Sequence, residues 1–366
     1  MVKIATKKEQ KDFYNLWRIC FEDSEVFSKW LFEKRFLPDF STYIQKDGKI
    51  VCCMQAYPLH ISICGNIVKG VMLCGVCTEP SYRKRGLMSQ LFKETMQILR
   101  KKGFIVAVHT PAKLNSYFSF GHLPVNRCKY IKTEMIPILE KKKEIFEIKE
   151  NFLALYHCYY HFSQRYSGIV SRTMADFLLK IEDYTIDGAK VIAYMPDREV
   201  KGYAVFYSTK DSIQAVEVVA QTQQDYQEII EGICSYGKGL KLSIKLPTDV
   251  SVTFPFIKEE IVEKGVAGVL QLPQLMGVLG SQKGYAIEVE DEIILENNGV
   301  FDLDGTKTDK TPDIKLNAGN MTQLLFGYCC LEELKQKGLV KIYHKDNAKK
   351  IASYYQKQNC YIIDEY

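Results

Sequence analysis

The stretch 71–102, VMLCGVCTEPSYRKRGLMSQLFKETMQILRKK, decides the fold, because in it a buried strand passes through a short basic loop into an amphipathic helix. Residues 71–77 have the length and apolar composition of a buried strand, and turn residues follow at 78–81. After the loop, apolar side chains recur every three or four positions, as in a helix with one buried face. A second apolar run, 104–108, predicts another buried strand.

The loop between this strand and this helix suits an anion. Arg83, Lys84 and Arg85 supply fixed positive charge, and the start of a helix offers unpaired backbone N–H groups. Gly86 lets a ligand approach the backbone closely. No G-K-[ST] of a nucleotide-triphosphate loop follows, and no G-x-G-x-x-G of a dinucleotide site is present. The loop therefore predicts a pyrophosphate site, and a solvated basic helix start is the alternative interpretation.

The spacing Arg83-x-x-Gly86-x-Met88 after an apolar strand resembles the acyl-CoA pyrophosphate loop of GCN5-related (GNAT) N-acetyltransferases. That family usually has Gly or Ala where Met88 stands, but its Eis-like (enhanced intracellular survival) group tolerates a large residue in an Arg-rich form. The resemblance implies acetyl-CoA as acyl donor and no metal. The cofactor-binding residues that it implies are Val76, Cys77, Thr78, Arg83, Lys84, Arg85, Gly86, Leu87, Met88, Ser89, Ala112 and Lys113.

Composition limits the class of protein. A chain of 366 residues is too long for one typical domain, and 46% hydrophobic residues suffice for packed cores. A net charge of +5 without a basic, aromatic-interleaved face argues against nucleic acid. Of the twelve cysteines, only Cys74 and Cys77 have C-x-x-C spacing, and both lie in the predicted buried strand, so the composition indicates reduced thiols and a cytoplasmic protein. No apolar signal core begins the chain, and charged residues or glycine interrupt its longest apolar region, so we expect no membrane association.

The first 135 residues predict one α/β domain. Thr6-x-x-Glu9 is a capping box for a first helix, and Asp23 or Ser24 can cap a second. Strands are expected at 41–45, 50–57 and 61–64 before the central strand, with an Asp-Gly turn after the first of them. In the GNAT family this order separates the central strand from its neighbour, and the resemblance implies that the coenzyme enters there.

Tyr117 is the predicted general acid. With Phe120 and Gly121 it resembles the Y-x-x-F-G segment of the Eis-like group, whose tyrosine protonates the departing thiolate of coenzyme A. A phenol with a pKa of about 10 and a thiol with a pKa of about 8.5 are close enough for this transfer. A packed aromatic residue is the alternative. His109 and His122 could relay a proton or be structural.

A covalent route is the alternative to direct attack. Cys77 beside the loop would permit an acyl-cysteine intermediate, but no evident base lies near it in the sequence. We therefore favour direct attack by the amine, with a strand N–H group polarising the carbonyl as an oxyanion donor.

Residues 136–267 repeat the layout of the first domain. A charged linker at 140–144 leads to helices at 151–162 and 173–181. Strands follow at 190–194, 202–207 and 212–220, then a helix at 224–236 and a strand at 241–245. No Arg-x-x-Gly loop stands at the equivalent junction, 219–223. We therefore expect a degenerate GNAT-like domain without a cofactor site, serving as scaffold or substrate wall.

Residues 268–366 predict a third domain. Strands are expected at 285–289, 292–296 and 299–303, followed by helices at 320–326, 331–337 and 346–358. The run 320–328 resembles the sterol-carrier-protein-like domain that closes Eis-like chains. That fold holds lipids elsewhere, so lipid carriage is one hypothesis. A structural cap on one side of the active cleft is the other.

The last residues and the second helix supply candidates for the acceptor site. In the Eis-like group the terminal carboxylate of an aromatic residue deprotonates the attacking amine, which implies this role for Tyr366. A free α-carboxylate with a pKa of about 3.3–3.7 is a poor base unless burial raises it. Asp364 and Glu365 would attract a cationic amine. Phe27 and Trp30 are possible apolar walls, and core packing is the alternative for both.

The sequence thus predicts tandem GNAT folds, the second degenerate, followed by a sterol-carrier-protein-like α/β domain. The expected activity is acetyl-CoA-dependent N-acetylation of cationic acceptors, aminoglycoside or polyamine-like or lysine side chains, by direct attack in a ternary complex. The resemblance implies a hexamer. A lipid-binding or scaffold protein without acyl transfer is the alternative function.

Overall fold

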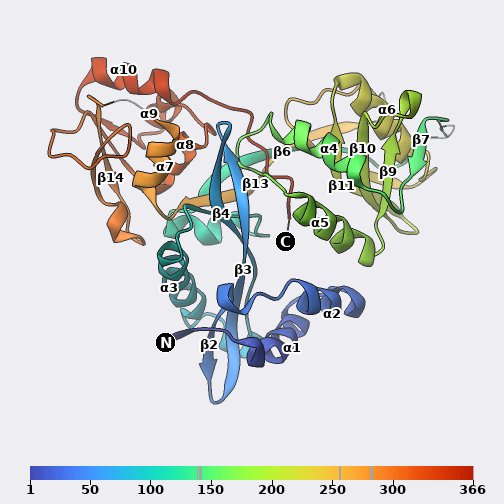
Figure 1. Cartoon of the computed structure of the whole chain (residues 1–366), viewed down its shortest axis with the longest axis horizontal. Coiled ribbons are helices and arrows are strands. Elements are labelled where there is room, and N and C mark those ends of the chain that lie inside the picture. Colours follow the sequence, from blue (N-terminus) through green and yellow to red (C-terminus); the bar gives the residue numbers. More distant parts are fainter. Residues whose placement is uncertain (138, 140–141, 255–256, 281–282, 366) are drawn as a thin grey trace.

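Two β-sheets carry the architecture of this computed structural model, which describes residues 1–137, 139, 142–254, 257–280 and 283–365. Within those residues, the larger sheet has thirteen strands and the smaller has four. The larger sheet has the order β1-β2-β3-β4-β5-β13-β6-β12-β11-β10-β9-β7, and β8 pairs with β3. Helices and the smaller sheet complete three lobes around this frame (Figure 1). The predicted α/β class is confirmed.

The first lobe follows the predicted order of two helices, antiparallel strands, a helix and a strand. Its elements are β1 (Val2–Ile4), α1 (Gln10–Cys20), α2 (Glu25–Lys34), β2 (Thr42–Lys46), β3 (Lys49–Ile63), β4 (Asn66–Thr78), α3 (Leu87–Lys101), β5 (Val106–His109) and β6 (Leu123–Thr133). Thr6 and Glu9 form the predicted capping box. Ser24 caps α2 by accepting a hydrogen bond from the Phe27 N–H. The strands expected at 50–57 and 61–64 are one strand, because residues 58–60 stay extended and pair with 69–71 of β4.

The helix α3 packs with the face that its sequence predicts. Leu91, Phe92, Met96 and Leu99 are almost fully buried against the sheet. Each large apolar side chain buried in this way stabilises the fold by about 1.5–3 kcal/mol. This packing fixes the position of the helix start, and with it the basic loop.

The strands β4 and β5 diverge, as predicted. They run parallel but pair only where residues 70–72 meet 106–108. β4 continues to Thr78 without β5 beside it. We call this divergence the first opening.

The second lobe repeats the first lobe's order of elements up to β5, with one additional two-residue strand between its first two helices. Its elements are β7 (Ile145–Glu147), α4 (Leu153–Ser163), β8 (Ile169–Val170), α5 (Met174–Ile186), β9 (Lys190–Tyr194), β10 (Gly202–Ser208), β11 (Ser212–Ala220), α6 (Gln223–Cys234) and β12 (Lys241–Pro247). Part of the expected linker, residues 140–141, lies outside the described residues. β11 and β12 pair in parallel only where 212–215 meet 241–244, while β11 continues to Ala220. We call this divergence the second opening.

Besides the short strands β1, β7 and β8 and the longer β6, one more strand of the larger sheet was not expected from the sequence. β13 (Lys258–Val269) lies between β5 and β6 and pairs antiparallel with both. Through β6 and β12 the sheet then continues into the second lobe. The first two lobes therefore share one sheet, whereas the domain limits 1–135, 136–267 and 268–366 stay predictions.

The third lobe contains α7 (Leu272–Leu279), β14 (Ala286–Glu290), β15 (Gly299–Asp302), β16 (Ile314–Asn317), α8 (Ala318–Leu325), α9 (Leu331–Gln336), β17 (Lys341–Ile342) and α10 (Lys345–Tyr354). The expected strand at 292–296 is wrong. Asp291 accepts hydrogen bonds from the backbone N–H groups of Ile293 and Ile294, and this local turn replaces the strand. β16 was not expected. Apolar residues of this lobe form one core cluster with β3, β4 and β13.

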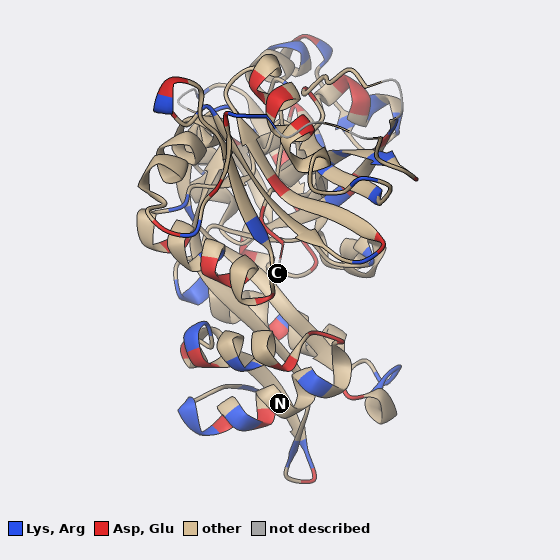
Figure 2. Ribbon diagram, turned by 90° about the vertical axis from the view of Figure 1, so that its right-hand side faces the viewer, with Lys and Arg blue, Asp and Glu red and all other residues tan. Residues whose placement is uncertain are grey.

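The chain end returns from the third lobe to the centre of the molecule. Both views place it between the lobes (Figures 1 and 2), and residues 361–364 are fully buried. Lys and Arg alternate with Asp and Glu along the ribbon in Figure 2, in keeping with the small net charge. In the described part of the chain, no helix combines the length and apolar character needed to cross a membrane.

Candidate active site

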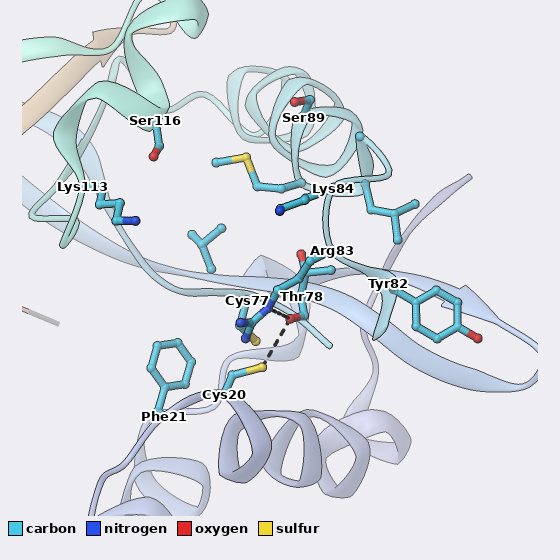
Figure 3. A pocket seen from close by; sticks show the side chains of 14 residues that line it. Cys20, Phe21, Cys77, Thr78, Tyr82, Arg83, Lys84, Ser89, Lys113 and Ser116 are labelled. Carbon is cyan, nitrogen blue, oxygen red and sulfur yellow. Dashed lines mark hydrogen bonds between the residues drawn. The ribbon is translucent and has the colours of Figure 1, made fainter. Parts of the chain in front are cut away.

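A cavity of about 560 Å³ lies at the first opening, between the end of β4 and the start of α3 (Figure 3). Most of the predicted cofactor-binding residues line it, namely Val76, Cys77, Thr78, Arg83, Lys84, Gly86, Leu87, Met88, Ser89 and Lys113. Arg85 is turned away, because its guanidinium donates to the Ser81 carbonyl and lies over the Tyr82 ring. Ala112 lines a second cavity instead. The structure therefore brings together ten of the twelve residues around one cavity.

The loop geometry fits a phosphate group. Gly86, the N-cap of α3, has a φ of 75°, and a Cβ built there meets no atom within 4 Å. The space in front of Gly86 is thus open, and the first N–H groups of α3 have no partner within the helix. The ammonium groups of Lys84 and Lys113 point into the cavity from opposite sides (Figure 3). Open backbone, amide donors and two cations make this cavity a fit for a pyrophosphate.

Arg83 holds the loop against the strand. Its Nε donates to the Thr78 carbonyl oxygen at 3.0 Å, and the Cys20 Sγ lies 3.6 Å from the same oxygen (Figure 3). The guanidinium still lines the cavity. Arg83 therefore both shapes the loop and adds charge to the cavity.

A β-bulge interrupts β4 beside the cavity. Cys53 of β3 pairs with Cys77, but Gln55 pairs with Cys74, so β4 carries one extra residue here. Gly75 within the bulge has a φ of 57° and packs against Trp17, where a Cβ would lie 2.6 Å from the ring. A bulge leaves a residue outside the ladder, so its backbone N–H is available to a ligand.

A second cavity of about 890 Å³ adjoins the first. The two share six lining residues, Phe21, Val76, Arg83, Met88, Lys113 and Ser116, which we call the junction. The second cavity is walled by the first lobe, by α5, β10 and β11 of the second lobe, and by Ile363 and Glu365 from the chain end. A molecule in the first cavity can therefore meet a different molecule in the second at the junction.

Tyr117 lines the second cavity close to the junction. It lies in a 3-10 turn, Leu114–Phe120, with its ring 4.4 Å from His109 and 5.3 Å from Phe92. Burial raises the pKa of Tyr117 to about 12. The phenol thus stays protonated near neutral pH, as a proton donor must, but it is a weaker acid than an ordinary tyrosine. The ring is at the same time a packed aromatic residue, so the two interpretations are compatible.

His109 and His122 form a buried pair. The Nε2 of His109 lies 3.1 Å from the Nδ1 of His122. Burial lowers the pKa of His109 well below its usual value and that of His122 to about 3. Both rings are therefore neutral, which favours the structural interpretation over a charged relay.

Cys77 is poorly suited to be a nucleophile. Its Sγ lies 3.5 Å from the Sγ of Cys53. A hydrogen bond with Cys20 favours the thiolate, but Cys53 and burial outweigh it and hold the pKa of Cys77 well above its usual value. Because the thiolate is the reactive form, this environment disfavours an acyl-cysteine route.

Acidic side chains on the second cavity differ in their partners. Asp183 is bonded to Arg35 and Lys180 at 3.0 Å each. Asp23 accepts from the Trp17 indole N–H at 2.9 Å, and Asp187 accepts from the Ser24 hydroxyl at 2.9 Å. No described lysine or arginine forms a salt bridge with either of these two carboxylates. They are free to meet a cationic ligand.

Sequence reasoning missed Asp187 and gave Asp23 only a possible helix cap. The tertiary contact between α2 and α5 brings them together, and the sequence carries no signal for that contact. Burial raises the pKa of Asp23, and the nearby charge of Asp187 adds to the shift.

The predicted acceptor residues divide into two groups. Phe27 and Glu365 line the second cavity. Trp30 does not line it, since its buried indole N–H donates to Glu182 at 2.8 Å. Asp364 is also turned away, because its carboxylate is fully buried against Arg172. Tyr366 lies outside the described residues.

Comparison with known protein families identifies the domain type of the first and third lobes. The model of an acetyltransferase (GNAT) domain matches residues 1–124, and that of a sterol carrier protein domain matches residues 272–362. No curated protein gives a match. The chain therefore contains a GNAT acetyltransferase domain, and GNAT domains use acetyl-CoA in general.

Solved structures share the fold over the whole chain. A probable N-acyltransferase from Enterococcus faecalis is 18% identical, with a TM-score of 0.83 and coverage of 100% of this chain and 99% of that chain. A GCN5-related N-acetyltransferase from Anabaena variabilis is 15% identical (TM-score 0.82), and Eis1 from Mycobacterium abscessus is 14% identical (TM-score 0.78), each with 100% coverage of both chains. The predicted combination of GNAT folds and a sterol-carrier-protein-like domain is confirmed, and the protein is an N-acetyltransferase.

Proposed function

We propose that the protein transfers the acetyl group of acetyl-CoA to the amine of a cationic acceptor, by direct attack in a ternary complex. The observation that carries this proposal is the junction, where a basic cavity at the first opening meets a second cavity that carries two carboxylates, Asp23 and Asp187, bonded to no described lysine or arginine. Two substrates can reach the junction from different sides and react without a covalent enzyme intermediate.

The first cavity supplies the contacts that a coenzyme pyrophosphate needs. Amide groups at the start of α3 and the ammonium groups of Lys84 and Lys113 would bind the phosphates. The edge of β4 at Val76 and Thr78, which β5 leaves unpaired, would bind the pantetheine. The thioester would then lie at the junction.

Two groups at the junction serve the chemical step. The amine attacks the thioester carbonyl, and the bulged backbone at Gly75 and Val76 would donate an N–H to the developing oxyanion. The carbon–sulfur bond then breaks, and Tyr117 gives its proton to the departing thiolate. The carboxylate of Tyr366 as base for the amine stays a prediction from the sequence.

The acceptor cavity favours a cationic amine. Asp23 and Asp187 offer two carboxylates from two lobes, and Phe27 offers an apolar face. Aminoglycosides and polyamines combine several ammonium groups with a flexible or flat body, and a lysine side chain presents one. These are the acceptor classes that we propose.

An amine-panel assay tests the proposal. Thiol release from acetyl-CoA is measured with aminoglycosides, polyamines, a lysine-containing peptide and an anionic amino acid, each at several concentrations. We expect turnover with the polycationic amines and none with the anionic one. Activity with the peptide alone would assign lysine as the acceptor, and the absence of thiol release with every amine would contradict the proposal.

Lipid carriage by the third lobe has less support. The apolar residues of that lobe pack in one cluster with β3, β4 and β13 of the large sheet. This packing favours the role of a structural cap, and recovery of bound lipid from purified protein would reverse that preference.

A further inference from the structure

The last described residues of the chain lie against the second lobe. Residues 361–365, which we call the C-terminal segment, run from the third lobe to the centre of the molecule beside the second lobe (Figure 1). Tyr361 and Ile363 belong to the same core cluster as the β11 residues Val218 and Val219 and the β12 residue Leu246. The segment thus packs in the core of the second lobe, together with residues from both strands of the second opening.

Charged side chains of the second lobe fix this segment. Arg172 bonds the Asp364 carboxylate at 3.0 Å and the Glu217 carboxylate of β11 at 2.7 Å. Lys180 of α5 donates to the Glu365 carbonyl at 2.9 Å. These contacts run from the second lobe to the last described residues.

Lys245 of β12 makes the most direct link. Its ammonium group donates to the Ile363 carbonyl at 3.0 Å and to the Glu365 carboxylate at 2.6 Å. The Lys245 side chain is only 3% exposed, whereas that of Glu365 is 40% exposed and lines the acceptor cavity. A buried cation therefore holds a partly open carboxylate at the cavity wall, and Lys264 assists from the other side at 3.3 Å.

We propose that the C-terminal segment is a fixed internal ligand of the second lobe, and that Lys245 is a positioning residue that holds Glu365 where the cationic acceptor binds. This inference rests on the proposed function, because it assigns Glu365 a part in acceptor binding. Lys245 itself does not line either cavity.

A double-mutant cycle tests this role. Lys245→Met, Glu365→Gln and the double variant are compared for the KM of the amine, kcat and the Kd of acetyl-CoA. Hydrogen bonds to charged groups contribute about 1.5–3 kcal/mol, so we expect each single change to raise the KM of the amine about tenfold or more. The Kd of acetyl-CoA should stay within about twofold, and the double variant should resemble Glu365→Gln.

Lys241→Met is the matched control. Lys241 lies on the same strand, but its side chain is 64% exposed and pairs with the exposed Glu134. This variant should behave like the wild type. Independent effects of Lys245→Met and Glu365→Gln, or an unchanged KM in Lys245→Met, would overturn the inference.

Hydrogen exchange tests the inference without turnover. Backbone amides of the C-terminal segment should exchange at least about tenfold faster in Lys245→Met than in Lys241→Met, because the anchor is lost. Equal exchange would contradict the anchoring role, even if Lys245→Met were less stable overall. If Lys245→Met does not fold, the KM of the amine in Glu365→Gln is the deciding measurement. An unchanged KM in that variant also overturns the inference.

The two proposals can fail separately. Wild-type turnover that neither variant affects overturns the role of Lys245 and leaves the proposed function standing. A wild-type protein that acetylates no amine overturns the proposed function, and with it the part assigned to Glu365.

Discussion

In each of the first two lobes, a pair of parallel strands diverges at the same place. The helix between these two strands, however, starts differently in the two lobes. α3 begins at Gly86, which provides no side-chain cap, and three basic residues precede it. α6 begins at Thr222, whose hydroxyl accepts from the Asp225 N–H while the Asp225 carboxylate accepts from the Thr222 N–H. The first helix start is left open for an anion, and the second is satisfied by an anion of its own.

The comparison teaches that a few residues decide whether this fold binds a coenzyme. Strand order and divergence are alike in both lobes. The second lobe replaces the basic loop with an acidic capping box, and the C-terminal segment packs in its core. An opening alone is therefore insufficient for a site, and the helix start must also be uncapped and electropositive.

The largest expected effect comes from removal of the proposed proton donor, the hydroxyl group of Tyr117. Tyr117→Phe removes the proton donor but keeps the packed ring, so kcat should fall by about a hundredfold to a thousandfold. The Kd of acetyl-CoA should change little. Tyr355→Phe is the control, because Tyr355 is equally buried but lies in the third lobe. Steady-state kinetics that show full activity in Tyr117→Phe would remove this residue from the mechanism.

The next change converts the first helix start to the type found in the second lobe. Gly86→Asp places a carboxylate at the N-cap of α3, where it would occupy the open N–H groups and repel phosphate. Loss of a charge-assisted phosphate contact and like-charge repulsion should weaken acetyl-CoA binding about a hundredfold, measured by calorimetry.

Gly65→Asp is a closely matched control for this change. Gly65 has a φ of 79° and open space around its Cβ position, but it lies in the β3–β4 turn. Both variants carry the same backbone strain, so only the position of the charge differs. Equal affinity in the two variants would argue against the phosphate site.

A smaller effect is expected from Asp23, which lies in the wall of the second cavity between the first and second lobes. Asp23→Asn should raise the KM of the cationic acceptor about tenfold, the loss expected for one hydrogen bond to a charged group. The exposed Asp39→Asn variant should leave the KM unchanged.

The same residue predicts a pH dependence. Burial raises the pKa of Asp23, and its protonated form carries no charge to attract an ammonium group. The KM of the acceptor should therefore rise as pH falls, starting at a higher pH than an ordinary aspartate would give. In Asp23→Asn this component of the pH profile should vanish, and an identical profile in both proteins would exclude Asp23.

The smallest effect is expected from removal of the side-chain cap at the start of α6 in the second lobe. Thr222→Ala should lower the free energy of unfolding by about 1 kcal/mol through loss of the cap, as should Thr173→Ala at the start of α5. Denaturant unfolding measures this loss. Neither variant should gain a second acetyl-CoA site, because residues 219–223 before α6 still lack basic side chains. A new site in Thr222→Ala would show that the cap alone blocks it.

Local sequence patterns predicted much of the fold and of the candidate site. The basic loop, the apolar face of α3 and the capping box at Thr6 depend on neighbouring residues, and the structure places them as expected. The order of helices and strands in the second lobe could be predicted for the same reason.

Features that depend on distant contacts could not be predicted. β13 lies between two strands of the first lobe that precede it by more than a hundred residues. Asp364 was expected at the acceptor because it is acidic, but Arg172 on another lobe draws it into the core. Trp30 was expected on a cavity wall, but Glu182 of α5 engages its indole. Asp23 and Asp187 meet only because α2 packs on α5.

The stoichiometry of acetyl-CoA binding tests the central claim most directly. Titration calorimetry at low salt on the full chain should give one saturable site per chain, since only the first opening has an uncapped, basic helix start. The Gly86→Asp variant should lose that heat and Gly65→Asp should keep it. Two sites per chain, or no heat with the unaltered protein, would contradict the account.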